Sequence, residues 1–484
     1  MKKKGSPSLL VGAILIISFA LTVTTAWAVG PGDIKWDQPV PMVERITGQG
    51  PVEVIGPEYN DYGVTLAGKK GMLTGYQLPA GWKEAIGDVK KLVLTNSGGL
   101  PHDPATVLNA KIFEKLTGIH LDIIEMKDPL LWPKTLAVLM AKSTDVDIFY
   151  STRSMLEIPH LSAARWIYPV DALWSPKVQE LYPKKILTTI QGIDGRFYGS
   201  PFCLWAMHLY YRPSWLAKAA VTVPTTWQDL VVASKKVDEW AKASLGPGYA
   251  GMVFAAGDPD QLHNIWAQTT FSQGKRIMKD RRVIIDPEAW KMVTDLWLKG
   301  GMSKESTEYL WSMAPEVFAK GKAGFDITGG VYMKMFANPE FGTGIQGDWD
   351  VTLTPGWKGI GNRAVNVAGN DSWMINPFIS PEKIAAGMLW FDYQRSYQAQ
   401  FNELYLEGNE SVMKAVYDHP SVKAEVEHPE LREATVAAQI GELYPPGMME
   451  VLDIFKEYLE RVVLEGMDPT EARKKAQEEI NTIM

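Results

Sequence analysis

Hydrophobic and polar positions alternate along most of the chain in a pattern that predicts strands and helices in turn. KKLVLTNSGG (90–99) is a short apolar run that ends in a Gly-rich polar loop, which is typical of a buried strand. VLNAKIFEKLTGI follows with apolar residues at helical spacing, and Gly118 is expected to end that helix. HLDIIEM (120–126), WPKTLAVLMAK and VDIFYS (146–151) continue as strand, helix and strand. This order predicts a sheet with helices packed on its faces.

The same alternation continues after residue 224. It predicts strands over 251–257 and 322–330 and helices over 225–240, 286–300, 380–394 and 468–484. Thr226 with Asp229, Ser380 and Asp468 stand where helix-capping residues are expected. In the last helix, a predicted buried stripe consists of Ala472, Ala476, Ile480 and Ile483.

Residues 29–89 differ from the rest of the chain because they are rich in Pro and Gly and contain only short strand-like runs such as VEVI. We interpret this N-terminal extension as a strap or a small hairpin that precedes the main fold. No internal repeat or low-complexity segment follows it.

Residues 1–28 have the parts of a secretory signal peptide: a basic start (MKKK), an apolar core (LLVGAILIISFALTV) and a small-x-small site (AWA). A transmembrane anchor is the alternative interpretation. Cleavage after Ala28 removes three lysines and no acidic residue, so the formal net charge changes from −7 to −10. An acidic chain without a basic run argues against nucleic acid and anionic membranes as partners. The residue directly after the predicted cleavage site is not a cysteine that could carry a lipid anchor, so we expect a free periplasmic protein.

Motifs for cofactor, metal or covalent chemistry are absent from the sequence. It contains no GxxxxGK[ST], HExxH or GxSxG, its seven His residues lack ligand spacing, and its single cysteine, Cys203, cannot form an intrachain disulfide. GIGNRA (359–364) lacks the preceding strand and following helix of a dinucleotide site. Asp258 and Asp260 are neighbours in sequence, whereas a glycosidase needs carboxylates that face each other across a sugar. We therefore expect no cofactor and no metal.

Over residues 90–484 the chain resembles the carbohydrate-binding, maltose-binding-like family of solute-binding proteins of ABC importers. In chain order, the resemblance is carried by NAKIFEKLTGI, VDIFYS, IDGRFYGSPFCLWAMHLYYRPSWLAKAAVTVPTTWQDL, EVFAKGKAGFDITGG, the helix after SPEK, and GMDPTEARKKAQEEIN. Arg212 stands where the family usually has Asn, and residues 29–89 have no counterpart.

The resemblance implies an α/β fold of the periplasmic binding protein-like type II class, with two lobes, hinge strands and a ligand cleft between them. It assigns residues 90–205 with 328–385 to the first lobe and 206–327 with 386–484 to the second. Trp205 would lie where the chain crosses between the lobes, at the floor of the cleft.

Candidate ligand-binding residues combine loops after strand ends with aromatic side chains, because sugars present paired hydroxyls to polar groups and apolar faces to rings. The candidates are Trp205, Asp258, Asn370, Asp371, Trp373, Arg153, Tyr150, Trp266, Tyr332, Asn96 and Asp103. Trp311 and Trp357 are further aromatic candidates. The alternative for each Trp is core packing, and for Arg153 a surface salt bridge.

These features predict a monomeric binding protein that captures a sugar or polyol by lobe closure and delivers it to the permease subunits of an ABC importer. Three alternatives stay open. The protein could be an exported carbohydrate-active enzyme, a binding protein of the same fold for a polyamine, or a ligand-loaded partner of a sensor.

Overall fold

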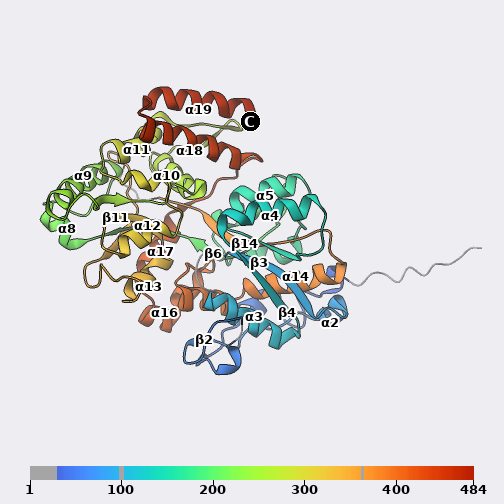
Figure 1. The fold of residues 1–484 in the computed structure, drawn as a ribbon. Coiled ribbons are helices and arrows are strands. Elements are labelled where there is room, and N and C mark those ends of the chain that lie inside the picture. The colour runs from blue at the N-terminus through green and yellow to red at the C-terminus, as the bar shows by residue number, and fades with distance from the viewer. Residues whose placement is uncertain (1–29, 61, 98–102, 361–364) are drawn as a thin grey trace, which may run out of the picture.

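The computed structural model describes residues 30–60, 62–97, 103–360 and 365–484, so the predicted signal peptide lies outside the described residues. The molecule consists of two lobes, each built around its own sheet (Figure 1). Blue, cyan and orange segments build the first lobe, whereas green, yellow and red segments build the second. The predicted two-lobe α/β architecture is confirmed.

The first lobe contains a five-stranded sheet in the order β4-β3-β5-β14-β6. β3 pairs in parallel with β4 and β5, whereas β14 runs antiparallel between β5 and β6. The strands are β3 (Lys91–Ser97), β4 (His120–Met126), β5 (Ile148–Ser151), β6 (Ser200–Trp205) and β14 (Gly369–Ile375). The main helices of this lobe are α3 (Pro104–Thr117), α4 (Asp128–Met140), α5 (Ser154–Ala163), α14 (Pro381–Gln394) and α15 (Tyr397–Asn402).

The second lobe contains a four-stranded sheet in the order β12-β7-β11-β8. Its strands are β7 (Met207–Tyr211), β8 (Ala250–Val253), β11 (Ala323–Gly329) and β12 (Asp350–Leu353). Its main helices are α9 (Trp227–Ser244), α10 (Pro259–Phe271), α11 (Pro287–Leu298), α12 (Met313–Ala319), α13 (Val331–Ala337), α18 (Met448–Glu465) and α19 (Pro469–Ile483).

Local capping signals match the observed helix ends. Gly118 takes a left-handed conformation (φ +74°) directly after α3. The Thr226 hydroxyl accepts the Asp229 N–H at the start of α9, and Ser380 and Asp468 cap α14 and α19 in the same way. The predicted stripe on α19 is buried except for Ile483, which lies in the last turn and is 48 % exposed.

The predicted lobe boundaries differ from the structure in two segments. β12 pairs with β7 of the second sheet, and α13 packs on that sheet through Tyr332 and Phe336. This part of 328–385 therefore lies in the second lobe. Conversely, Trp390, Phe401 and other core residues up to Val436 are buried in the first lobe. A pattern of apolar spacing defines a helix but does not specify which of two sheets it covers, which explains both differences.

Short segments connect the two lobes. Leu204 and Met207 lie on either side of one crossing, and Ala368 and Val367 on either side of another. A third crossing contains β15 (Gln439–Ile440), which pairs in parallel with β13 (Asn366–Val367). Side-chain amides tie these segments together: Asn366 donates to the Met207 carbonyl at 2.6 Å, and Gln439 donates to the Trp205 carbonyl at 3.0 Å. The crossings therefore form one hydrogen-bonded hinge.

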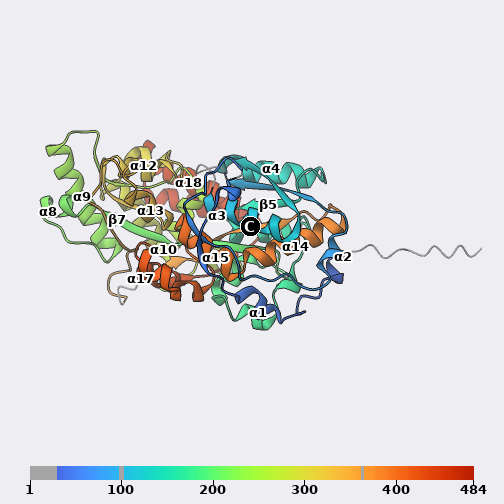
Figure 2. The ribbon, with the colours of Figure 1, turned by 90° about the horizontal axis from the view of Figure 1, so that it is seen from below.

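The N-terminal extension packs onto the first lobe, along which its α1 (Met42–Thr47) and α2 (Trp82–Ile86) lie (Figure 2). It contains the hairpin β1 (Val52–Val54) and β2 (Lys70–Met72). Arg45 is fully buried and forms an ion pair with Asp392 of α14, and the Tyr76 hydroxyl donates to the same carboxylate at 2.6 Å. The extension is thus an integral part of the first lobe's core.

Within the described part of the chain, no helix combines the length and apolar composition that crossing a bilayer requires.

Candidate ligand-binding cleft

A cleft lies between the lobes, beside the carboxyl ends of β3, β5 and β11. It contains about 910 Å³ of space free of protein atoms, part of which is open to solvent. Ser97 and Thr152 line it from the first lobe, and Thr328 and Gly329 line it from the second. Ligands of α/β proteins bind in the crevice outside the carboxyl ends of the strands, which is where this cleft lies.

The floor of the cleft pairs an aromatic ring with a carboxylate at the crossing after β6. The Trp205 indole N–H donates to Asp371 Oδ1 at 2.6 Å, and the Tyr150 hydroxyl donates to Asp371 Oδ2 at 2.7 Å. Burial and the Asp371 charge raise the pKa of Tyr150, so its hydroxyl keeps its proton. Trp205 is only half-buried, and its fixed ring is accessible from the cleft.

Loops of the second lobe form the opposite wall. Asp258 precedes α10, and its Oδ2 accepts the Trp311 backbone N–H at 2.5 Å. The Trp311 ring packs against Tyr332 with centroids 5.6 Å apart. This wall repeats the chemistry of the floor, because it also combines a carboxylate with aromatic rings.

One charged contact connects the two lobes directly across the cleft. Arg153 precedes α5 in the first lobe, and its Nε lies 3.8 Å from Asp260 Oδ2 in the first turn of α10. Both side chains are about nine-tenths buried. Arg153 therefore forms an interlobe ion pair and not the surface salt bridge considered above.

Glu410 is a cleft residue that sequence reasoning missed. It is 1 % exposed and pairs with the fully buried Arg432 at 2.9 Å. Burial raises the pKa of Glu410 to about 7, although Arg432 opposes the shift. Its carboxylate lies directly against Gly330, where no space for a Cβ atom exists. No motif surrounds Glu410, so only the folded structure brings it to the cleft.

Comparison with known proteins places this architecture in a family. The family model of the bacterial extracellular solute-binding proteins matches residues 109–430. The chain belongs to this family. The family-level resemblance predicted from the sequence is thereby confirmed.

Solved structures share the fold of this solute-binding protein. Maltose-bound MalE3 of T. maritima matches with a TM-score of 0.70 and 22 % identity, covering 81 % of this chain and 100 % of that one. An ABC transporter solute-binding protein from Agrobacterium radiobacter K84, in complex with ribitol, has a TM-score of 0.69 and 21 % identity over 82 % and 99 % of the chains. Another, from Agrobacterium vitis S4 with bound D-mannitol, has a TM-score of 0.66 and 17 % identity, covering 81 % of this chain and 98 % of that one. The type II fold is confirmed.

The cleft brings together most of the residues singled out in the sequence. Those that line it are Trp205, Asp258, Asp371, Arg153, Tyr150, Tyr332, Asp103 and Trp311. Those that lie outside it are Asn370, Trp373, Trp266, Asn96 and Trp357. Asp260, Gln261, Asn409 and Glu410 line it without having been selected as ligand-binding candidates.

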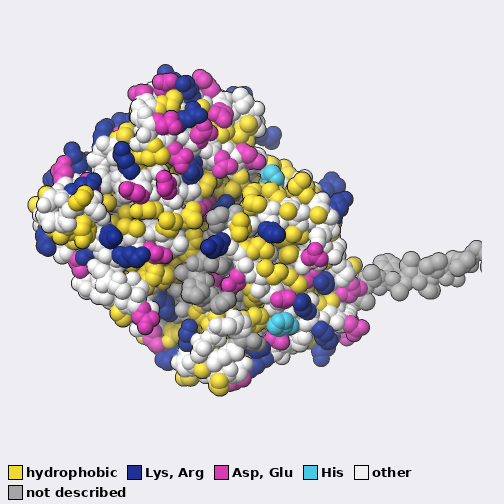
Figure 3. All heavy atoms as spheres, in the orientation of Figure 1, with side chains coloured by type: hydrophobic (Ala, Val, Ile, Leu, Met, Phe, Trp, Pro, Cys, Tyr) yellow, Lys and Arg dark blue, Asp and Glu magenta, His cyan; other side chains and the backbone are white. Residues whose placement is uncertain are grey.

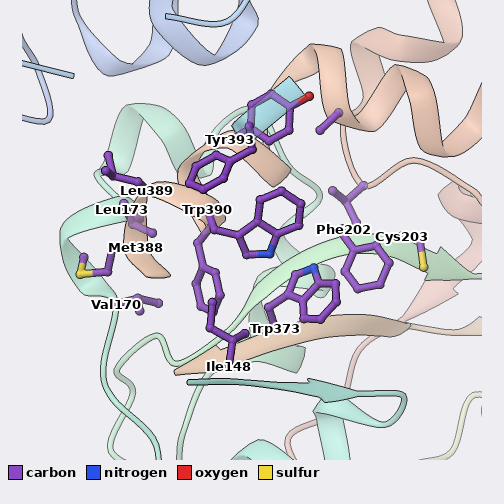
Figure 4. Packing of buried hydrophobic residues seen from close by; sticks show 14 of the residues in the cluster. Ile148, Val170, Leu173, Phe202, Cys203, Trp373, Met388, Leu389, Trp390 and Tyr393 are labelled. Atoms are coloured by element: carbon purple, nitrogen blue, oxygen red, sulfur yellow. The ribbon is translucent and has the colours of Figure 1, made fainter. Parts of the chain in front are cut away.

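Trp373 and Asn370 support the cleft from behind. Trp373 is fully buried beneath the floor, stacked on Phe202 and close to Trp390 (Figure 4). It lies two residues farther along β14 than Asp371, which places it inside the core. Asn370 is also fully buried, and its Oδ1 accepts the Ser154 hydroxyl at 2.7 Å, which anchors the start of α5.

The other three residues do not line the cleft because of their positions in the fold. Trp266 lies in the middle of α10, away from its cleft-facing start, and stacks on Phe455 at 4.5 Å. Trp357 packs against the core of the second lobe. Asn96 and Ser97 are consecutive in β3, so their side chains point to opposite faces, and only Ser97 lines the cleft.

Proposed function

We propose that this solute-binding protein captures a sugar or polyol in the interlobe cleft. The observation that carries the proposal is the arrangement of Trp205, Asp371 and Tyr150. An aromatic ring held by a carboxylate offers a stacking face for C–H groups, with hydrogen-bond acceptors for hydroxyls at its edge. Asp258 and the Trp311 ring supply a carboxylate and an aromatic surface from the other lobe, although Asp258 bonds to the Trp311 backbone and not to its ring.

Capture proceeds by closure of the lobes around the hinge. A ligand that touches both walls gains its full set of contacts only when the lobes are together, so binding shifts the population toward the closed state. The Arg153–Asp260 pair adds a ligand-independent contact between the lobes. This mechanism needs no covalent step, cofactor or metal, so we propose binding without turnover.

Support for the ligand class comes from proteins of the same fold. The similar structures were solved with maltose, ribitol and D-mannitol, which are neutral and rich in hydroxyls. Because the sequence identity to these proteins is low, the ligand has to be inferred from the side chains of this chain's own cleft. Its cleft carries five carboxylates, which suit hydroxyl groups as hydrogen-bond donors: Asp103, Asp258, Asp260, Asp371 and Glu410.

Delivery to the permease subunits of an ABC importer is the second part of the proposal, with the monomeric protein acting in the periplasm after loss of residues 1–28. Exposed hydrophobic side chains occur on both lobes, including Met140 of α4 and Met313 of α12. Hydrophobic side chains lie on both sides of the lobe boundary, and charges of both signs are interspersed over the visible face (Figure 3). A partner that contacts both lobes would distinguish the closed form from the open one.

The test is a thermal-shift screen of residues 29–484 against maltose, ribitol, mannitol, other sugars and polyols, polyamines and amino acids, followed by calorimetry on each hit. A ligand at a hundredfold excess over its Kd stabilises the folded state by roughly 2.7 kcal/mol. Stabilisation by one sugar or polyol supports the proposal. Stabilisation by polyamines alone would refute the ligand class, and release of sugar products from oligosaccharides would favour the enzyme alternative.

A further inference from the structure

A second chamber lies in the first lobe, beside the end of β3 and separate from the cleft. It contains about 610 Å³ of space free of protein atoms, part of it open to solvent. Four described segments contribute polar residues: Tyr62 of the N-terminal extension, Asn96 near the end of β3, Glu125 near the end of β4, and Asp103 and Thr106 at the start of α3. Among the described residues, Asp103 alone lines both the chamber and the cleft.

Among the described residues that line the chamber, two have a buried polar atom without a hydrogen-bond partner. Asn96 is 2 % exposed and Thr106 is 1 % exposed, and neither Asn96 Oδ1 nor Thr106 Oγ1 is hydrogen-bonded. Buried polar groups are nearly always paired, because an unpaired one loses its hydration without compensation. A ligand with hydrogen-bond donors would pair both atoms.

The charge of the chamber selects the kind of donor. Asp103 and Glu125 line it, and no Lys or Arg does so among the described residues. Within the described segments, no group of three or more His, Cys, Asp or Glu side chains is arranged to hold a metal ion. The electrostatic field therefore favours an organic cation.

We propose that this chamber binds the ammonium group of a small aliphatic amine. An ammonium group carries three N–H donors and no acceptor, which matches two unpaired acceptors beside carboxylates. One face of the Tyr62 ring is stacked on His120, and the other face would provide the surface for a cation–π contact. Val107 and Ile123 offer apolar contact to the methylene groups of the amine. Because all the described residues that line the chamber belong to the first lobe, binding there does not depend on lobe closure.

Calorimetry of residues 29–484 with 1,4-diaminobutane tests the proposal, with 1,4-butanediol as the uncharged analogue of equal length. Two conservative variants probe the chamber: Thr106→Val removes an unpaired hydroxyl, and Glu125→Gln removes the charge of an exposed side chain. We expect each variant to weaken diamine binding by about tenfold, the size of one hydrogen bond to a charged group. We expect the diol not to bind at this site.

Trp205→Ala separates the chamber from the cleft. Diamine binding that persists in this variant and weakens in the two chamber variants supports the proposal, whatever the cleft binds. Three results would overturn it: no diamine binding, equal binding of the diol, or binding that is lost in Trp205→Ala and unchanged in both chamber variants.

Discussion

Gly330 is the position where a single methyl group should disrupt the cleft. It precedes α13 in the second lobe, and the Glu410 carboxylate of the first lobe occupies the space that a Cβ atom would need. Glu410 is not free to move aside, because it is 1 % exposed and paired with the buried Arg432. Gly330→Ala must therefore displace the carboxylate from its partner or push the lobes apart.

The size of the effect follows from the ion pair. Breaking a buried pair and leaving one charge uncompensated costs about 3–5 kcal/mol. Gly329→Ala is the matched control, because its Cβ would meet only Val331 Cγ1, at the ordinary distance of 3.9 Å. We expect the control to change the free energy of unfolding by less than about 1 kcal/mol.

Urea unfolding at pH 8, followed by tryptophan fluorescence, measures both variants. At this pH Glu410 is ionised, since its pKa is about 7, and the ion pair is complete. Combining Gly330→Ala with Glu410→Ala adds a second criterion: the double variant should lose less stability than the sum of the single variants, because both remove the same contact. Equal stability of the two glycine variants, or strict additivity in the double variant, would refute the reasoning.

Three further predictions concern the cleft floor, the extension and a buried histidine. Trp205→Ala should keep the fold and weaken binding of the ligand found by screening by about tenfold or more, and wild-type affinity by calorimetry would contradict the cleft assignment. Arg45→Ala should cost about 1.5–3 kcal/mol in urea unfolding, because Asp392 loses one buried guanidinium partner and keeps the other, Arg395. Lys70→Ala, which removes an exposed pair with Glu425, should cost less than about 1 kcal/mol. Burial lowers the pKa of His208 to about 3, so as the pH falls from 6.5 this histidine is protonated in the unfolded chain before it is protonated in the folded one. Between pH 6.5 and 5 the stability of the wild type should therefore drop by about 2 kcal/mol more than that of His208→Gln. Parallel pH profiles of the two proteins would contradict this.

Local signals made several helix ends predictable. Thr226, Ser380 and Asp468 cap helices through contacts with residues two or three positions away, so their environment is contained in a short window of sequence. Trp205 and Asp371 were predictable for a different reason, because both belong to segments next to a crossing that the family resemblance located.

Contacts between distant segments were not predictable. Arg153 meets Asp260, and Glu410 meets Gly330, only because the two lobes come together. The same limit applies to the N-terminal extension. The spacing of its apolar residues does not reveal that Arg45 would lie buried beside Asp392.

The position of β14 has a consequence for the order in which the lobes can form during synthesis. β5 and β6 do not pair with each other but only through β14, whose residue Trp373 pairs with Tyr150. All four strands of the second sheet lie within residues 207–353 and are therefore complete before β14 emerges. The sheet of the second lobe can thus form while, in the first lobe, the edges of β5 and β6 that pair with β14 are still open. Such long-range pairing slows folding, and it leaves the edges of β5 and β6 open to strand pairing until residue 375 is available.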